Sequence, residues 1–127
     1  MHDAVFQGIE SEKLKAYAVW EPILRTDNLR GARKATTILP DDRVRHYWIA
    51  GQHVGEAFKP ALGLKEEVAW DVYLVYRAGV EWIGSRPPKP SFYMHQLHEL
   101  PNARRLDART LAAQVRSAIE VTPTRKP

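Results

Sequence analysis

Apolar residues along the chain fall into strand-like runs separated by segments with helical spacing. The run from Lys15 to Leu24 (KAYAVWEPIL) is rich in aromatic and β-branched residues, which favour strands, and Pro22 marks its end or a turn. We expect a strand here that is buried on both faces. The segment from Val44 to Ile49 predicts a second strand, and Gly51 provides the break after it.

Helical spacing appears first between these two strands and then directly after the second. Asp27 and Asn28 are good N-cap residues, and apolar residues then recur at helical spacing before Pro40, namely Leu29, Ala32, Ala35 and Ile38. A second apolar stripe runs from Val54 to Leu62, where Pro60 kinks or ends the helix and Gly63 closes it.

The two ends of the chain also predict helices. Near the C-terminus, Asp107 is the expected N-cap, and Leu106 and Leu111 form a hydrophobic staple around it. The buried stripe of that helix is expected to comprise Leu111, Val115, Ala118 and Ile119. Residues Ala4 to Ile9 are expected to be the tail of a helix, with Val5, Phe6 and Ile9 on one face.

The clearest strand pattern is AWDVYLVYR, from Ala69 to Arg77. The turn residues Ala78 and Gly79 follow, and then Val80 to Ile83, so a β-hairpin is predicted. Prolines in SRPPKP exclude a helix or a central strand, and we therefore expect residues 85–105 to form a proline-rich loop region. Residues 121–127 are expected to be a flexible tail.

This order of elements predicts a single α/β domain over residues 1–127. Parallel strands joined by helices, followed by a hairpin and a covering helix, form a layered domain with a mixed sheet.

Composition narrows the possible chemistry. The chain has 127 residues, 44% of them hydrophobic, a net charge of +4 and no cysteine, which excludes thiol catalysis, disulfides and cysteine metal sites within it. It has neither an apolar run of bilayer length nor a secretory signal, so we expect a cytoplasmic protein without membrane contact. We expect no cofactor.

These segments together resemble the thioredoxin-like superfamily, in particular its redoxin branch. The resemblance extends from about Leu14 to the end and rests on the strand Lys15 to Leu24, the inserted helix and strand VRHYWI, the helix GQHVGEAFKPALGL, the hairpin AWDVYLVYRAGVEW and the closing helix Leu106 to Glu120. It implies a three-layer domain that lacks its N-terminal strand and the helix that carries the CxxC motif. It also implies a substrate groove, with Trp70, Asp71, Trp20 and Pro22 as the groove candidates.

Two departures from the family count against redox activity. No cysteine is present for a CxxC or peroxidatic centre, and Ala69, Trp70 and Asp71 stand where the family usually has a cis-proline. In the family, the missing strand lies between the counterparts of Lys15 to Leu24 and Ala69 to Arg77. Its loss leaves two unpaired edges, which the two strands close by pairing directly, or which a second chain or upstream residues close.

Histidine and aspartate side chains are further candidates for chemical sites. His95 and His98 share one face if they lie on a helix, which makes them a weak metal candidate, although histidines packed in a loop or at the surface are favoured. Asp71 is expected to pair with an arginine at the solvent end of its strand, the alternative being a buried acid or base catalyst. His46 is expected to pack and hydrogen-bond beside a tryptophan.

Basic residues are concentrated in two stretches. They comprise Arg25, Arg30, Arg33, Lys34, Arg43 and Arg45, and near the last helix Arg104, Arg105, Arg109 and Arg116. Arg30, Arg33 and Lys34 occupy the polar face of a helix, and no DNA- or RNA-binding motif accompanies them, so a nucleic-acid partner is disfavoured.

The sequence thus favours a non-catalytic thioredoxin-like binding domain, with a protein partner or a second copy engaging unpaired strand edges. The first alternative is the C-terminal part of a thiol-disulfide oxidoreductase whose cysteine segment lies upstream. The second is a basic nucleic-acid-associated protein.

Overall fold

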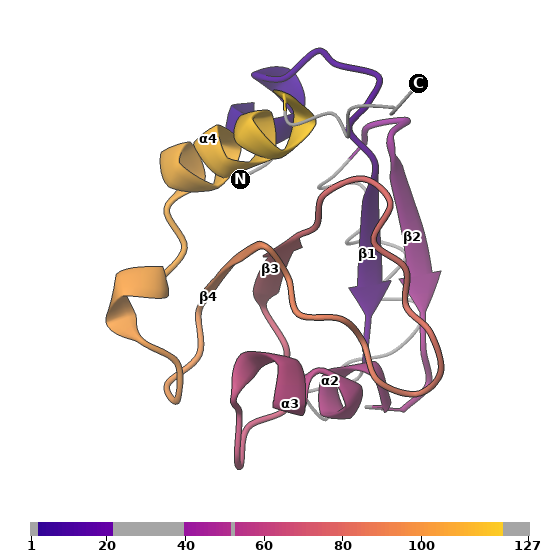
Figure 1. Ribbon diagram of the computed structural model, residues 1–127, viewed down its shortest axis with the longest axis vertical. Coiled ribbons are helices and arrows are strands. Elements are labelled where there is room, and N and C mark those ends of the chain that lie inside the picture. The colour runs from indigo at the N-terminus through magenta and orange to yellow at the C-terminus, as the bar shows by residue number, and fades with distance from the viewer. Residues whose placement is uncertain (1–2, 22–39, 52, 121–127) are drawn as a thin grey trace, which may run out of the picture.

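The computed structural model describes residues 3–21, 40–51 and 53–120 (Figure 1). Pro22, the helix expected between Leu29 and Ile38 and the tail 121–127 lie outside the described residues. The chain combines helices with small sheets, which makes it an α/β protein. Helix α4 and the N-terminal turn lie together at one end of the molecule, and α2 and α3 lie at the other.

The first sheet consists of β1 (Ala16–Trp20) and β2 (Val44–Trp48), which run parallel with Ala16 opposite Val44 and Trp20 opposite Trp48. Exposure alternates along both strands, with Tyr17, Val19, Arg45 and Tyr47 exposed and the residues between them buried or partly buried. The prediction that the first strand is buried on both faces was therefore wrong. Ala16 and Ala18 pack toward the core, whereas the opposite face meets solvent.

The second sheet pairs β3 (Val72–Val75) with β4 (Phe92–His95) in antiparallel register, Val72 opposite His95. The predicted hairpin with Val80 to Ile83 was wrong, as was the assignment of the whole segment 85–105 to a loop, which also contains η3 (Asn102–Arg104). The reason is burial. In β4, Met94 and His95 are buried, whereas Val80, Trp82 and Ile83 are exposed, and Ile83 only forms an isolated bridge to Arg86.

The described strands form two two-stranded sheets instead of the single mixed sheet expected. Within the described residues, β1 pairs only with β2 and β3 only with β4, so β1 and β3 do not close the expected gap by pairing with each other.

One hydrophobic core nevertheless joins both sheets. It lies beneath α4 (Ala108–Glu120) and the short π-helical turn η1 (Asp3–Gln7), and its buried members are Val5, Phe6, Ile9, Leu14, Val44, Val75, Met94, Leu111, Ala112 and Val115. The predicted buried faces of both terminal helices are thereby confirmed. A second cluster near α3 contains Leu62, Leu64, Ala69, Leu97 and Leu100.

The start of α4 confirms the predicted cap. Asp107 Oδ2 accepts a hydrogen bond from the backbone N–H of Thr110 at 3.0 Å and another from the Thr110 hydroxyl. The side-chain hydrogen bond from Thr110, followed by the backbone one, lowers the pKa of Asp107. The carboxylate thus satisfies one of the donors that the first helical turn leaves free.

The helical segment after β2 is divided into two short helices. Helix α2 covers His53–Ala57 and α3 covers Lys59–Leu62, with Pro60 in the first turn of α3. Gly63 ends α3 with a φ of 75°, a left-handed conformation that glycine adopts without steric cost. The predicted break at the proline and the closing glycine are both confirmed.

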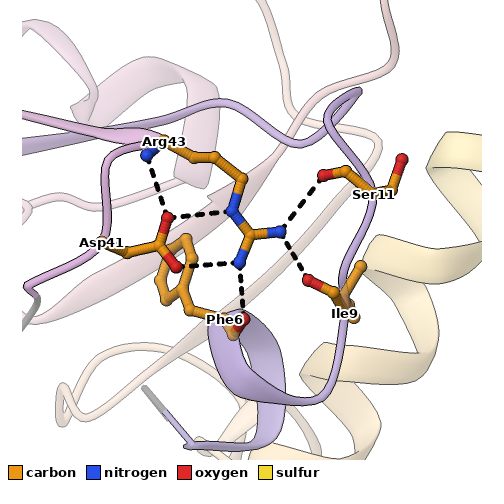
Figure 2. A network of polar contacts seen from close by, with 5 residues as sticks. All are labelled: Phe6, Ile9, Ser11, Asp41 and Arg43. Carbon is orange, nitrogen blue, oxygen red and sulfur yellow. Dashed lines mark hydrogen bonds and ion pairs between the residues drawn. The ribbon is translucent and has the colours of Figure 1, made fainter.

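Arg43, just before β2, holds the N-terminal segment in place (Figure 2). Its guanidinium donates to the carbonyl oxygens of Phe6, Ile9 and Ser11, and it makes two hydrogen bonds to Asp41, at 2.9 and 2.8 Å. The hydrogen bond to Asp41 raises the pKa of Arg43 above its ordinary value. One planar side chain thus connects residues that lie more than thirty positions away in the sequence.

Candidate functional site

The carboxyl end of β1 is built around Glu21. Its Oε1 accepts hydrogen bonds from the backbone N–H groups of Val54 at 2.8 Å and Gly55 at 3.1 Å, so the carboxylate binds the first turn of α2. In α/β proteins, ligands commonly bind beyond the carboxyl ends of parallel strands. Glu21 therefore fixes a helix at the edge where a binding site is expected.

The same helix fixes the turn that precedes β3. The backbone N–H of Ala69 donates to the carbonyl oxygen of Gly55 at 3.1 Å. A Cβ on Gly55 would lie 2.8 Å from the Ala69 oxygen and 2.9 Å from Glu21 Oε2, so only glycine allows this approach. The end of β1, the start of α2 and the turn before β3 thus form one connected unit.

Asp71 has a left-handed backbone conformation, with a φ of 49°. Among the described residues, it is the one non-glycine residue with a positive φ. Such a conformation costs energy and persists where neighbouring contacts enforce it, which is common at ligand sites. Here the Asp71 carbonyl accepts the backbone N–H of Gln96 at 3.1 Å. Its Oδ1 accepts the Tyr73 hydroxyl at 2.9 Å and the Gln96 side-chain amide at 3.4 Å.

The tyrosine at this turn has altered acidity. Burial, together with the hydrogen bond and the negative charge of Asp71, raises the pKa of Tyr73 to about 12. Tyr73 is therefore a neutral donor at ordinary pH and positions the Asp71 carboxylate. In the described part of the chain, the side-chain partners of Asp71 are Tyr73 and Gln96 and not the expected arginine.

Trp70 lies on this turn with 39% of its surface exposed. The structure therefore brings Trp70 and Asp71 together at one exposed turn. Trp20 is half-buried, and its indole N–H donates to His46 Nδ1 at 3.1 Å with the rings nearly parallel. The expected packing of His46 beside a tryptophan is thereby confirmed. The indole N–H of Trp20 is used in this hydrogen bond. Pro22 lies outside the described residues.

The two histidines considered for metal binding are separated by the fold. His95 lies on β4 with 0% exposure, where its Nδ1 accepts the N–H of Leu97 and its Nε2 faces the Pro101 carbonyl oxygen at 2.7 Å. His98 is exposed in the following loop. The helix that would align them is not formed, and no group of three metal-ligating side chains occurs among the described residues.

Two glutamates connect the loop after α3 with the loop after β4. The Glu99 carboxylate accepts the backbone N–H groups of Lys65 at 2.9 Å, Glu66 at 2.8 Å and Glu67. Glu67 Oε1 in turn accepts the N–H groups of His98 and Glu99 at 3.0 and 2.8 Å. The backbone hydrogen bonds from Glu67 and Lys65 lower the pKa of Glu99. This reciprocal arrangement, here termed the glutamate clasp, leads directly into the Trp70 turn.

Sequence reasoning missed Glu21, Gly55, Tyr73 and Gln96 as parts of this site. A glutamate directly after a strand and a glycine in an otherwise apolar helical stripe were visible signals. Gln96 could not be assigned, because its place depends on the pairing of β3 with β4, which the sequence did not predict.

Searches of protein-family models, curated proteins and solved structures found no match to this chain. Within the described residues, no helix is both long and apolar enough to cross a membrane.

Proposed function

We propose that this chain is a non-catalytic thioredoxin-like binding domain that contacts a polypeptide partner at the turn formed by Trp70 and Asp71. The observation that carries the proposal is an exposed tryptophan beside a strained Asp71 that Tyr73 and Gln96 hold in place. Tryptophan on a rigid support contributes strongly to binding, because little conformational entropy is lost on contact.

The order of the elements supports the thioredoxin-like assignment. A parallel pair, a helical segment, an antiparallel pair and a closing helix follow one another along the chain, although the strand that pairs with β3 is Phe92–His95 and not Val80 to Ile83, on which the resemblance rested. In a three-layer domain of this kind, both pairs belong to one sheet, whereas here they form two sheets that share one core beneath α4.

The strand edges support a polypeptide as the partner. In β1, the N–H of Ala16 donates to the carbonyl oxygen of Arg43, and the carbonyl oxygen of Trp20 accepts from the N–H of Ile49. Because the backbone groups of successive residues point to opposite sides of a strand, those of Tyr17 and Val19 point away from β2. Such an edge pairs with an extended segment of a partner or of a second copy.

Binding of an unfolded polypeptide tests this function. A fluorescently labelled, carboxymethylated polypeptide is titrated with the chain, and the anisotropy gives the dissociation constant. Trp70→Ala should weaken binding about tenfold or more, because the exposed indole is lost. Tyr47→Ala, which removes a similarly exposed aromatic ring on β2, serves as the matched control and should leave binding unchanged.

Equal binding by the Trp70→Ala variant and the unaltered chain would refute the assignment of this turn. Insulin reduction with dithiothreitol provides a separate check on the absence of catalysis. The chain should add nothing to the background rate, since it has no cysteine. Turnover above background would refute the non-catalytic assignment.

A further inference from the structure

The outer face of the β1–β2 sheet carries a mixture of aromatic and basic side chains. Lys15, Tyr17 and Val19 on the first strand segment and Arg45 and Tyr47 on the second are all exposed. The alternate residues of both strands point toward the core, so these five side chains share the face that the core does not cover. We term this set the tyrosine face.

Two tyrosines dominate this face. Tyr17 is 67% exposed and Tyr47 is 46% exposed, and their rings stack with centroids 6.3 Å apart and planes inclined by 30°. Tyr17 lies opposite Arg45 in the strand register, and Val19 lies opposite Tyr47. The sheet therefore presents aromatic rings on a rigid support, with a guanidinium group directly beside them.

The charge of the tyrosine face is uniformly positive. Lys15 and Arg45 contribute two cations, and none of the five side chains is acidic. Within the described part of the chain, neither cation has an ion-pair partner. The whole chain carries a net charge of +4, which adds a long-range attraction for polyanions.

We propose that the tyrosine face binds single-stranded nucleic acid. Exposed aromatic rings on a sheet stack with unpaired bases, and neighbouring cations neutralise the phosphates between them. Double-stranded nucleic acid keeps its bases stacked on one another and would not use the rings. Protein interfaces also use tyrosine and arginine, so contact between copies of the chain is one of the outcomes that the test distinguishes.

This inference revises the expectation from the sequence, which disfavoured nucleic acid because the basic residues had no accompanying motif. The sequence placed Tyr17 in a strand expected to be buried on both faces and Tyr47 in a second strand. The structure brings them to one solvent-facing surface together with Arg45, because β1 and β2 pair in parallel and expose the same alternate positions.

Fluorescence anisotropy with labelled 12-nucleotide oligo(dT) and oligo(U), and with a duplex of equal length, tests the proposal. Both single strands should bind at about 50 mM salt and the duplex should bind more weakly. Two phosphate contacts predict a slope of about −1.4 for log K against log salt concentration. The relative affinity of the two single strands then shows whether DNA or RNA is preferred.

Variants separate stacking from charge. Tyr17→Ala and Tyr47→Ala should each weaken binding about tenfold, whereas Tyr17→Phe, which keeps the ring, should retain it. Arg45→Gln should reduce the salt slope by about 0.7. Trp70→Ala is the control and should leave oligonucleotide binding unchanged, which separates this site from the proposed polypeptide site. If an alanine variant fails to fold by circular dichroism, Tyr17→Thr and Tyr47→Thr remove the rings while favouring a strand.

Several results would overturn the proposal. They are the absence of oligonucleotide binding by the unaltered chain, equal affinity of the ring-removing variants, or a duplex that binds as tightly as the single strands. A further one is self-association, measured by sedimentation, that the tyrosine variants abolish without any effect on oligonucleotides. That result would assign the face to contact between copies of the chain.

Discussion

Among the residues that the structure describes, Asp71 has the most unusual local geometry. Its carboxylate and carbonyl oxygens both serve the turn, the first toward Tyr73 and the second toward Gln96. Asparagine, aspartate and glycine tolerate positive φ best, because a short polar side chain can bond to nearby groups. The residue type therefore fits the conformation, although the sequence pattern alone placed Asp71 inside a strand.

Replacement of Asp71 by alanine should bring the pKa of Tyr73 down from about 12, because the accepting carboxylate and its charge are lost. Burial is the larger cause, so the pKa should stay above that of a free tyrosine, about 10. Tyrosine ring carbon shifts followed by NMR against pH give the value. A Tyr73 titration that is identical in both proteins would contradict the assigned hydrogen bond.

The sign of the pH effect follows from the raised pKa. Folding favours the neutral phenol, so the stabilisation is complete below about pH 10 and is lost as the pH rises through about 12. Urea denaturation at pH 9 and at pH 11 gives the free energy of unfolding at each pH. Between these two values it should fall less for Asp71→Ala than for the unaltered chain.

At the scale of elements, helix caps and breaks were predicted correctly from local sequence, whereas the pairing of the strands was not. The cap at Asp107, the break at Pro60 and the left-handed Gly63 depend on a few neighbouring residues, and all three are confirmed. The partner of β3 depends on which distant segment buries its side chains. Val80 to Ile83 had the better strand composition, but Phe92–His95 supplies the buried Met94.

The glutamate clasp should respond to acid. The pKa of Glu99 is lowered by folding, so its contribution to stability is present above the unfolded value of about 4.3 and is lost as the pH falls below it.

At neutral pH, Glu99→Gln should accelerate hydrogen exchange at the amides of residues 65–67, because a neutral amide accepts these bonds less strongly.

Glu66→Gln is the matched control for this experiment, because the exposed Glu66 side chain lies outside the clasp although its amide belongs to it. Exchange at residues 65–67 should be unchanged in that variant. Equal acceleration in both variants would indicate a general effect of charge and would refute the clasp.

At the scale of the whole molecule, two separate sheets under one core explain why the fold class was predictable and its sheet was not. Apolar periodicity predicts which faces are buried, and α4 and η1 cover the expected core. Periodicity contains no information on which edges meet. The same limit applies to the candidate site. Trp70 and Asp71 are neighbours in the sequence and were predicted together. The other members, Glu21, Gly55 and Gln96, come from three other segments and were not predicted.

Hydrogen exchange tests the edge of β1 that faces away from β2, with which no described strand pairs. The amides of Tyr17 and Val19 should exchange more than about tenfold faster than that of Ala18, which faces β2, since exchange reports the opening of each hydrogen bond. The measurement is made on dilute protein by NMR. Equal protection of all three amides would show that this edge is already covered.

The arginine at the start of β2 has a consequence for how the molecule comes apart in acid. A guanidinium stays charged at every pH that a protein experiences, and three of its acceptors are backbone carbonyls, which do not titrate. Asp107, Glu99 and Asp41 lose their negative charge on acidification, so Arg43 loses its ion pair with Asp41 but keeps its hydrogen bonds to the carbonyl oxygens of Phe6, Ile9 and Ser11. Hydrogen exchange followed against pH should therefore show the loops beside Trp70 losing protection at a higher pH than residues 3–12.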